Sequence, residues 1–120
     1  MQSVFSGVVE CLVDGPRESD GARVAGFMFP ESFAGFDGHF PGNPVVPGIV
    51  QIYAAMITAG RENALGEVKR CKFMRPVLPG ERVVVTLVTE SIEGALRCKA
   101  DITAAGDACA SMTLILVPDA

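Results

Sequence analysis

The sequence has few of the residues from which metal and redox sites are built. Its 120 residues include one histidine, and the four cysteines form no Cys-x-x-Cys pair: Cys11, Cys71, Cys98 and Cys109. With so few nitrogen and sulfur ligands, a zinc site is hard to assemble. We therefore expect no metal and no other cofactor, and we interpret the four thiols as reduced.

Positive charge is also scarce. Ten lysines and arginines stand against fourteen aspartates and glutamates, so the formal net charge is -4. A nucleic-acid-binding protein needs a net basic surface that displaces counterions from the phosphate backbone. The charge balance therefore argues against a nucleic-acid partner.

Signals for export and for membrane insertion are missing as well. The first ten residues show no basic segment followed by an apolar one, so we expect a cytoplasmic protein. The stretch 38–60 carries no charged side chain, but Pro41, Pro44 and Pro47 interrupt its first part. Only residues 47–60 remain, which is the length of a buried helix and too short to span a membrane.

The length and the apolar content indicate one folded domain covering residues 1–120. A chain of this size has room for one core, and 49% of its residues are hydrophobic. That proportion is slightly high for a monomer. We therefore expect part of the apolar surface to contact a second subunit, as in a homodimer or a larger assembly.

The pattern along the chain predicts strands at both ends. In the C-terminal half, three segments have the alternation or the β-branched content of strands and form an expected antiparallel meander: 82–90, 96–103 and 108–117. Two weaker strand candidates lie near the N-terminus, at 4–13 and 23–29. They are separated by the turn-rich segment 14–21.

One helix is predicted between these groups of strands. Ile49, Ile52, Tyr53, Met56 and Ile57 recur at the spacing of a single helical face. The other faces carry small or weakly polar residues, so we expect the helix to be buried nearly all round. These elements favour an α+β architecture in which a curved antiparallel sheet wraps around one long central helix.

The segment 35–48, with the sequence GFDGHFPGNPVVPG, holds the only histidine, His39, directly before this helix. Its prolines lower the entropy lost on ordering, and its glycines allow a ligand to approach the backbone closely. His39 can exchange a proton at neutral pH. The N–H groups of Gly48 and Ile49 can polarise a carbonyl, such as that of a thioester. This pairing suits removal of a proton α to a carbonyl.

Two motifs resemble a known family. Residues 38–48, GHFPGNPVVPG, resemble the GHFPGxPxxPG signature of the 3-hydroxyacyl-acyl carrier protein dehydratases, and residues 72–81, KFMRPVLPGE, are similar to the KFRRPVxPGD segment of the same family. The resemblance implies a hot dog fold and a dimer with active sites at the subunit interface. It also implies an acyl-thioester substrate on a phosphopantetheine arm.

The sequence departs from the family at one catalytic position. The family's helix bears a carboxylate fourteen positions after the histidine, and here that residue is Tyr53. A phenol is neutral at pH 7 and can donate a hydrogen bond, but it cannot replace a carboxylate in relaying protons. Tyr53 could protonate the leaving hydroxyl, or it could be a packing residue. Asp37 and Glu62 are near in sequence, but neither stands at the family's position.

The remaining site residues follow from the same resemblance. We expect contacts to the acyl chain from Phe36, Phe40, Val45, Ile49 and Ile57. Phe36 and Phe40 could equally be core residues that anchor the loop.

Basic charge is concentrated in residues 61–82, although the chain as a whole is acidic. Lys69, Arg70, Lys72 and Arg75 could guide an acidic acyl carrier protein or hold the phosphates of coenzyme A. They could equally be solvated charges on a turn and a strand edge.

Three functions are therefore considered. The first is dehydration of a 3-hydroxyacyl thioester to the trans-2-enoyl thioester, with His39 as base, Gly48 polarising the carbonyl and Tyr53 assisting at the hydroxyl. The second is an acyl-thioester-binding subunit whose partner chain supplies the missing carboxylate. The third is thioester hydrolysis, for which Asp37 and Glu62 are the only nearby carboxylates.

Overall fold

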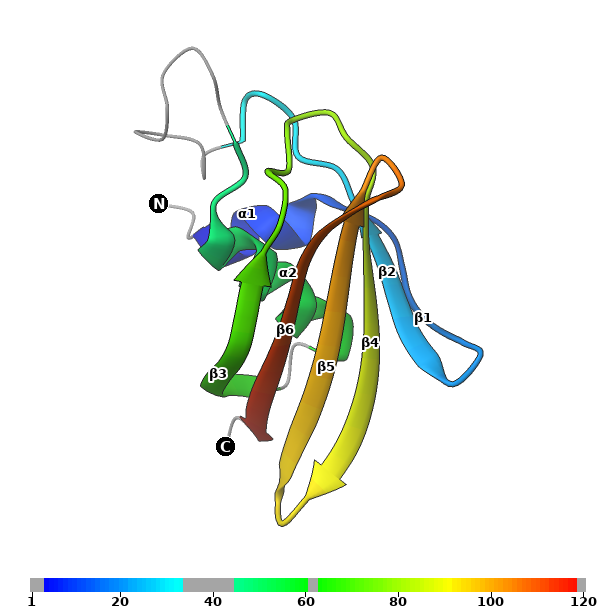
Figure 1. Ribbon diagram of the computed structural model, residues 1–120, viewed down its shortest axis with the longest axis vertical. Helices are drawn as coiled ribbons and strands as arrows, with labels where there is room; N and C mark the ends of the chain where they lie inside the picture. Colours follow the sequence, from blue (N-terminus) through cyan, green and yellow to red (C-terminus); the bar gives the residue numbers. More distant parts are fainter. Residues whose placement is uncertain (1–3, 34–44, 61–62, 119–120) are drawn as a thin grey trace.

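The computed structural model describes residues 4–33, 45–60 and 63–118 (Figure 1). These residues form two helices and six strands. In chain order they are α1 (Val4–Glu10), β1 (Leu12–Ser19), β2 (Ala22–Phe27), α2 (Gly48–Ala59), β3 (Asn63–Phe73), β4 (Val83–Ile92), β5 (Ala95–Ala104) and β6 (Asp107–Pro118).

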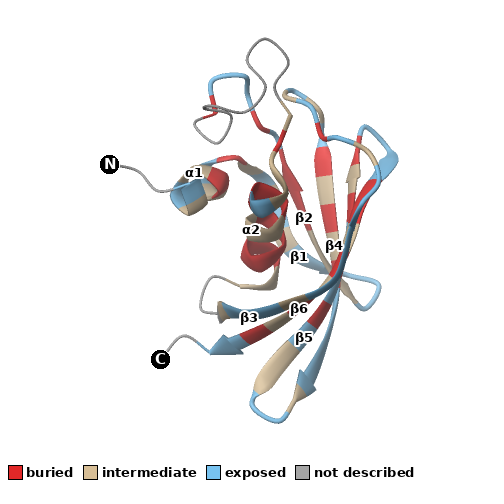
Figure 2. Cartoon of the chain, turned by 60° about the vertical axis from the view of Figure 1, so that its left-hand side comes forward, coloured by how far each residue is buried: buried red, intermediate tan, exposed pale blue. Residues whose placement is uncertain are grey.

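The strands form one antiparallel sheet in the order β1-β2-β4-β5-β6-β3. The sheet curves around α2, and α1 lies beside α2 on the same face (Figure 2). This arrangement confirms the expected α+β architecture with a curved sheet around a central helix. The opposite face, called the outer face below, carries no helix among the described residues.

In β5, apolar and polar residues alternate, and as predicted the strand is buried on one face of the sheet only. Cys98, Ala100 and Ile102 are fully buried against the helix side, whereas Arg97 and Lys99 are exposed on the outer face. In β4, Val85 and Leu87 are likewise buried. Its outer-face residues are only half-buried or exposed, because nothing covers that face in the described chain. The β-branched residues of β4 therefore indicate a strand inside the sheet, but this strand is buried on one face only.

Helix α2 is present as predicted, but its buried face differs from the expected one. Val50, Ala54 and Ile57 are almost fully buried, whereas Ile49 is 47% exposed and Tyr53 is half-buried. The expectation that the helix is buried nearly all round is confirmed for most of its surface, since its small and weakly polar residues are buried and Ile49 is its one exposed residue. The sheet covers one side of α2 and α1 covers only part of the other. Neither described helix is long and apolar enough to cross a membrane.

The N-terminal expectations were also wrong in part. Residues 4–13, expected as a strand, form α1 and the start of β1. Residues 14–21, expected as a turn, lie mostly in β1, and the reversal is confined to Asp20 and Gly21, both with positive φ. Tertiary packing overrides local preference here, because Val8 of α1 is fully buried in the core.

Strand β3 was not predicted as a strand. It is an edge strand that pairs only with β6, and its register shifts between Leu65 and Glu67 and between Lys69 and Lys72. These bulges break the alternation by which a strand is recognised in a sequence. Charged residues on an edge strand also discourage pairing with other chains.

An ion pair braces the loop of residues 74–82, which connects β3 to β4. Arg75 binds Glu81 through two contacts, Nη2 to Oε2 at 2.6 Å and Nη1 to Oε1 at 2.8 Å. The N–H of Leu78 donates to the same Oε1 at 2.8 Å. The loop then accepts a hydrogen bond at Val77 O from the N–H of Val46, at 2.8 Å, just before α2. The brace thus supports the start of the helix.

We predict that this carboxylate contributes to stability in a defined pH range. The hydrogen bond from Arg75, aided by that from Leu78, lowers the pKa of Glu81 from 4.5 to about 2. A lowered native pKa stabilises the fold above the unfolded value, and the benefit disappears as the pH falls from 4.5 towards 2. Glu81→Gln should lower the free energy of unfolding at pH 7 and flatten its decline in this acidic range.

Urea unfolding at several pH values measures both effects. A matched control is Glu90→Gln, because the carboxylate of Glu90 is 65% exposed and lies 3.5 Å from Arg97. This control should leave the curve unchanged, since exposed ion pairs contribute little. An unaltered pH dependence in Glu81→Gln would contradict the role assigned to the brace.

Candidate functional site

The start of helix α2 is fixed by the backbone of residues 45–47. Pro47 has φ -61° and ψ 153°, and its carbonyl accepts hydrogen bonds from Val50 N at 3.1 Å and Gln51 N at 3.3 Å. Within the part of the chain that the structure describes, no side chain caps the helix. Among the described residues, the N–H groups of Gly48 and Ile49 therefore have no acceptor. They point from the positive end of the helix dipole and can donate to an oxygen that gains negative charge.

Gly48 is covered by an aromatic ring from the second motif. A Cβ atom added at Gly48 would lie 2.8 Å from Cζ of Phe73, the last residue of β3. The ring can approach the helix start this closely only because position 48 has no side chain. The two motifs therefore touch at two places, through Gly48 and Phe73 and through Val46 and Val77. Sequence reasoning gave no role to Phe73, although it stands inside the second motif.

Several predicted site residues lie outside the residues that the structure describes. These are His39, Phe36 and Phe40, together with the carboxylates Asp37 and Glu62. The proximity of His39 to Gly48 therefore stays a prediction. Gly48 itself takes the first position of α2, as expected.

Tyr53 lies one and a half turns along α2 from Gly48, a rise of about 7.5 Å. Its ring packs edge-on against Phe5 of α1, with the centroids 5.2 Å apart and the planes at 77°. The hydroxyl has no hydrogen-bond partner among the described residues. The ring thus has a packing role between the helices, and the hydroxyl stays available to donate.

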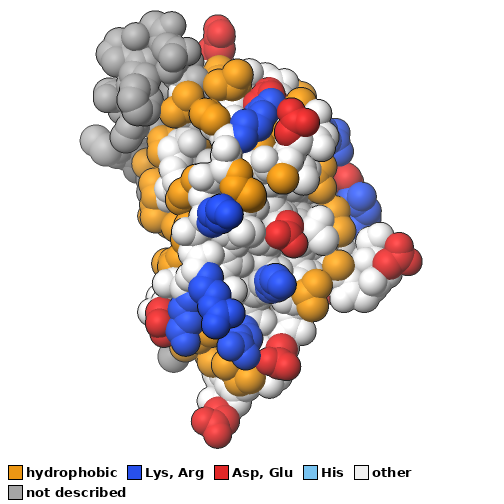
Figure 3. Space-filling view, in the orientation of Figure 1, with side chains coloured by type: hydrophobic (Ala, Val, Ile, Leu, Met, Phe, Trp, Pro, Cys, Tyr) orange, Lys and Arg blue, Asp and Glu red, His pale blue; other side chains and the backbone are white. Residues whose placement is uncertain are grey.

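Three of the residues expected to contact the acyl chain, Val45, Ile49 and Ile57, are described by the structure, and they differ in burial. Val45 is half-buried before the helix, and Ile57 lies in the core with 2% of its surface exposed. Ile49 is exposed beside Gly48, and Phe73 and Met74 nearby are 50% and 47% exposed. Hydrophobic side chains also gather along the upper left of the surface in Figure 3. The structure thus places exposed apolar surface at the helix start.

The four basic residues differ in their surroundings. Lys69, Arg70 and Lys72 are exposed on β3. Arg75 is instead held by Glu81 and lies 3.5 Å from Asp107 of β6. The hydrogen bond to Glu81 is the main cause that raises the pKa of Arg75. The guanidinium of Arg75 therefore braces the loop, while the other three cations face solvent.

Comparison with known proteins identifies related dehydratases. Residues 16–113 match the ApeI-like family, described as ApeI dehydratase. A 3-hydroxyacyl-[acyl-carrier-protein] dehydratase FabZ of Clostridium acetobutylicum is 33% identical over 98 residues, which is 69% of this chain and 68% of that protein. The FabZ of Alkaliphilus metalliredigens is 33% identical over 85 residues, 62% of this chain, and there the match spans only about half of the relative, 56%.

Solved structures support the fold. The dehydratase heterocomplex ApeI:P from Xenorhabdus doucetiae contains a chain that superposes with a TM-score of 0.71 at 18% identity, covering 88% of this chain and 96% of that one. At this identity the likeness concerns the fold alone. It agrees with the hot dog fold that the two motifs implied.

We predict that Gly48 and Phe73 are energetically coupled. Gly48→Ala should gain helix propensity but lose slightly more by displacing the half-exposed ring, with a net destabilisation of about a few tenths of a kcal/mol. In a Phe73→Ala background the same substitution should be neutral or stabilising by up to about 1 kcal/mol. Chemical unfolding of the wild type, both single variants and the double variant measures this coupling. Equal effects of Gly48→Ala in both backgrounds would refute the contact.

Proposed function

The chain belongs to the ApeI-like dehydratase family, and from this membership we propose that it acts in the dehydration of 3-hydroxyacyl thioesters to trans-2-enoyl thioesters. The family match over residues 16–113 is the observation that carries the proposal. The N–H groups at the start of α2, which have no acceptor among the described residues, supply the chemical feature that such a reaction needs at the thioester carbonyl.

The proposed reaction removes a proton from C2 and the hydroxyl group from C3. His39 takes the C2 proton as the general base, and electron density shifts to the thioester oxygen. The N–H of Gly48 stabilises that oxygen by hydrogen bonding. The C3 hydroxyl then leaves as water after receiving a proton, while the double bond forms between C2 and C3. Protonation of the leaving group is the step that requires an acid.

Tyr53 occupies the position from which the family's carboxylate acts. Its phenol can donate the proton to the leaving hydroxyl, but it then has to recover a proton from His39 or from water. The hydroxyl lacks a partner among the described residues, which favours such a donor role over pure packing. The contact with Phe5 holds the ring in place.

A second candidate function is a subunit of a heterocomplex whose partner provides the carboxylate. Two features favour it: the phenol of Tyr53 at the position where the resemblance implies a carboxylate, and the dehydratase heterocomplex whose chain has the same fold. Exposed Ile49, Phe73 and Met74 near Gly48 offer an apolar surface for a partner subunit. A second copy of this chain would use the same surface in a homodimer.

We further propose that the acyl chain arrives on an acyl carrier protein, as the names of the FabZ relatives state for those enzymes. Coenzyme A is the alternative carrier. Lys69, Arg70 and Lys72 are the exposed cations available to attract an acidic carrier. Arg75 contributes through the loop that it braces.

The direct test is turnover of 3-hydroxyacyl thioesters on carrier protein and on coenzyme A, followed by enoyl absorbance. If the chain acts alone, His39→Ala should reduce the rate by about 10²–10⁴ and Tyr53→Phe should reduce it as well. Tyr53→Glu should raise the rate, because it restores the carboxylate at the family's position. Thermal unfolding of each variant separates loss of chemistry from loss of fold.

Two other outcomes assign the function differently. Activity that appears only after a partner chain is added would support the heterocomplex subunit. If neither the isolated chain nor such a complex turns over more than its His39→Ala variant, the proposal of a dehydratase site is wrong. A drop in stability without any gain in rate for Tyr53→Glu would mean that Tyr53 is a packing residue only.

A further inference from the structure

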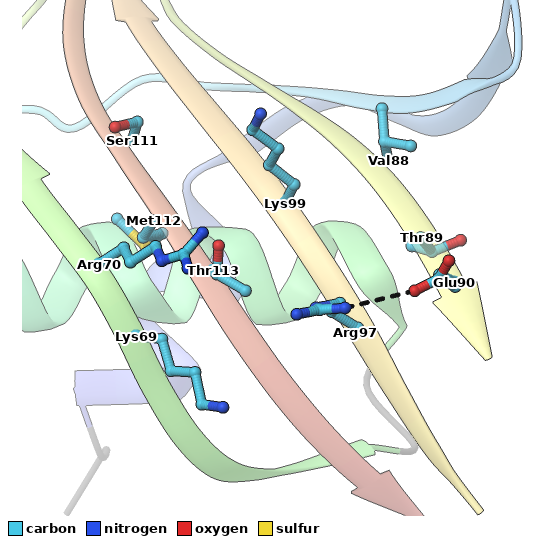
Figure 4. A pocket seen from close by; sticks show the side chains of 10 residues that line it. All are labelled: Lys69, Arg70, Val88, Thr89, Glu90, Arg97, Lys99, Ser111, Met112 and Thr113. Atoms are coloured by element: carbon cyan, nitrogen blue, oxygen red, sulfur yellow. Dashed lines mark ion pairs between the residues drawn. The ribbon is translucent and has the colours of Figure 1, made fainter. Parts of the chain in front are cut away.

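The outer face of the sheet carries a hollow of about 520 Å³, on the side away from α2 (Figure 4). Strands β3, β4, β5 and β6 all contribute to it. Its polar lining consists of four cations, three hydroxyl groups and one carboxylate: Lys69, Arg70, Arg97, Lys99, Thr89, Ser111, Thr113 and Glu90. It lies on the opposite face from the helix side of the sheet, so it is separate from the candidate dehydration site.

The register of the strands brings two lysines to either side of one hydroxyl. Thr113 of β6 pairs with Lys99 of β5 on one side and with Lys69 of β3 on the other. Neighbouring strands are about 4.8 Å apart, so the two lysine Cα atoms are separated by roughly 10 Å. Side chains of this length can converge on an anion above Thr113.

A bulge adds a third cation to the same place. Arg70 follows Lys69 directly and would point to the other face in a regular strand. The register instead shifts between Lys69 and Lys72, and Arg70 adopts a positive φ of 51°. This conformation is unfavourable for a residue with a side chain. It nevertheless places Arg70 among the residues that line the hollow. A bulge that re-aims a side chain in this way often marks a binding site.

The positive charge of the hollow is only partly neutralised. Glu90 lies 3.5 Å from Arg97, and Glu67 lies 3.9 Å from Lys69. Among the described residues Arg70 and Lys99 form no ion pair. Grouping like charges costs free energy unless an anion compensates for it. The concentration of cations stands out in a chain whose net charge is -4.

We infer that this hollow binds an anion that carries two or more phosphate groups. Cations with adjacent hydroxyl donors match the oxygens of phosphates, and the volume exceeds that needed for a single phosphate. A second copy of this chain is a poor occupant for the same face, because its cations would meet cations. The inference goes beyond the proposed dehydration and does not depend on it.

Isothermal titration calorimetry with inorganic pyrophosphate at low ionic strength tests the inference. The protein should bind pyrophosphate saturably, and Arg70→Gly and Lys99→Ala should each weaken binding about tenfold, as expected for a lost hydrogen bond to a charged group. Glycine accepts the positive φ at position 70, so Arg70→Gly should fold at least as well as the wild type. The matched control Arg17→Ala, an exposed cation of β1 outside the lining, should bind normally.

A parallel titration with ADP distinguishes the source of the phosphates. Tighter binding of ADP than of pyrophosphate, with the same loss in Arg70→Gly, supports a nucleoside diphosphate, and equal binding supports the diphosphate group alone. No saturable binding of either, or an equal loss in Arg17→Ala, overturns the inference. It is also overturned if polyglutamate binds with this variant dependence and pyrophosphate does not, since the face would then be a docking surface for an acidic protein.

Discussion

The proposed site depends on the ion pair between Arg75 and Glu81. These two side chains hold the loop of residues 74–82 in one shape, and the carbonyl of Val77 in that loop accepts the hydrogen bond from Val46. Val46 in turn precedes the first turn of α2. The orientation of the helix start, and with it the direction of its free N–H groups, therefore rests on charges that lie outside the helix.

The two faces of the sheet have different chemistry. On the helix side, the exposed apolar residues cluster where the second motif meets Gly48, which fits an acyl group or a partner subunit. On the outer face, rows of lysine, arginine and threonine fit a phosphorylated anion. A single layer of strands separates these surfaces, so one small domain presents both.

Much of the fold follows from the sequence, and the failures have physical reasons. The period of β5 and the helical spacing in residues 49–57 predicted those elements because burial on one side imposes a period. The prediction of a strand at residues 4–10 was wrong because their helix depends on packing against α2, which no local sequence pattern records. The edge strand β3 was not predicted because two bulges interrupt the alternation of its side chains.

The candidate site was predictable to a similar degree. The position of Gly48 at the start of a helix was predictable, because this glycine ends a recognisable motif directly before the helical spacing begins. The contact of Phe73 with Gly48 and the bracing by Arg75 were not predictable, because both join residues with no periodic relation. The chain thus specifies its site through the contact between the helix start and the end of β3 and through the ion pair in the loop that follows, and not through the helix alone.

The most direct test of this account is amide hydrogen exchange at Val46, whose N–H donates to Val77. If the brace fixes the helix start, this amide should exchange slowly in the wild type and much faster in Glu81→Gln, while the amides of β5 keep their protection. Unchanged protection at Val46 in that variant would show that the helix start does not depend on the ion pair.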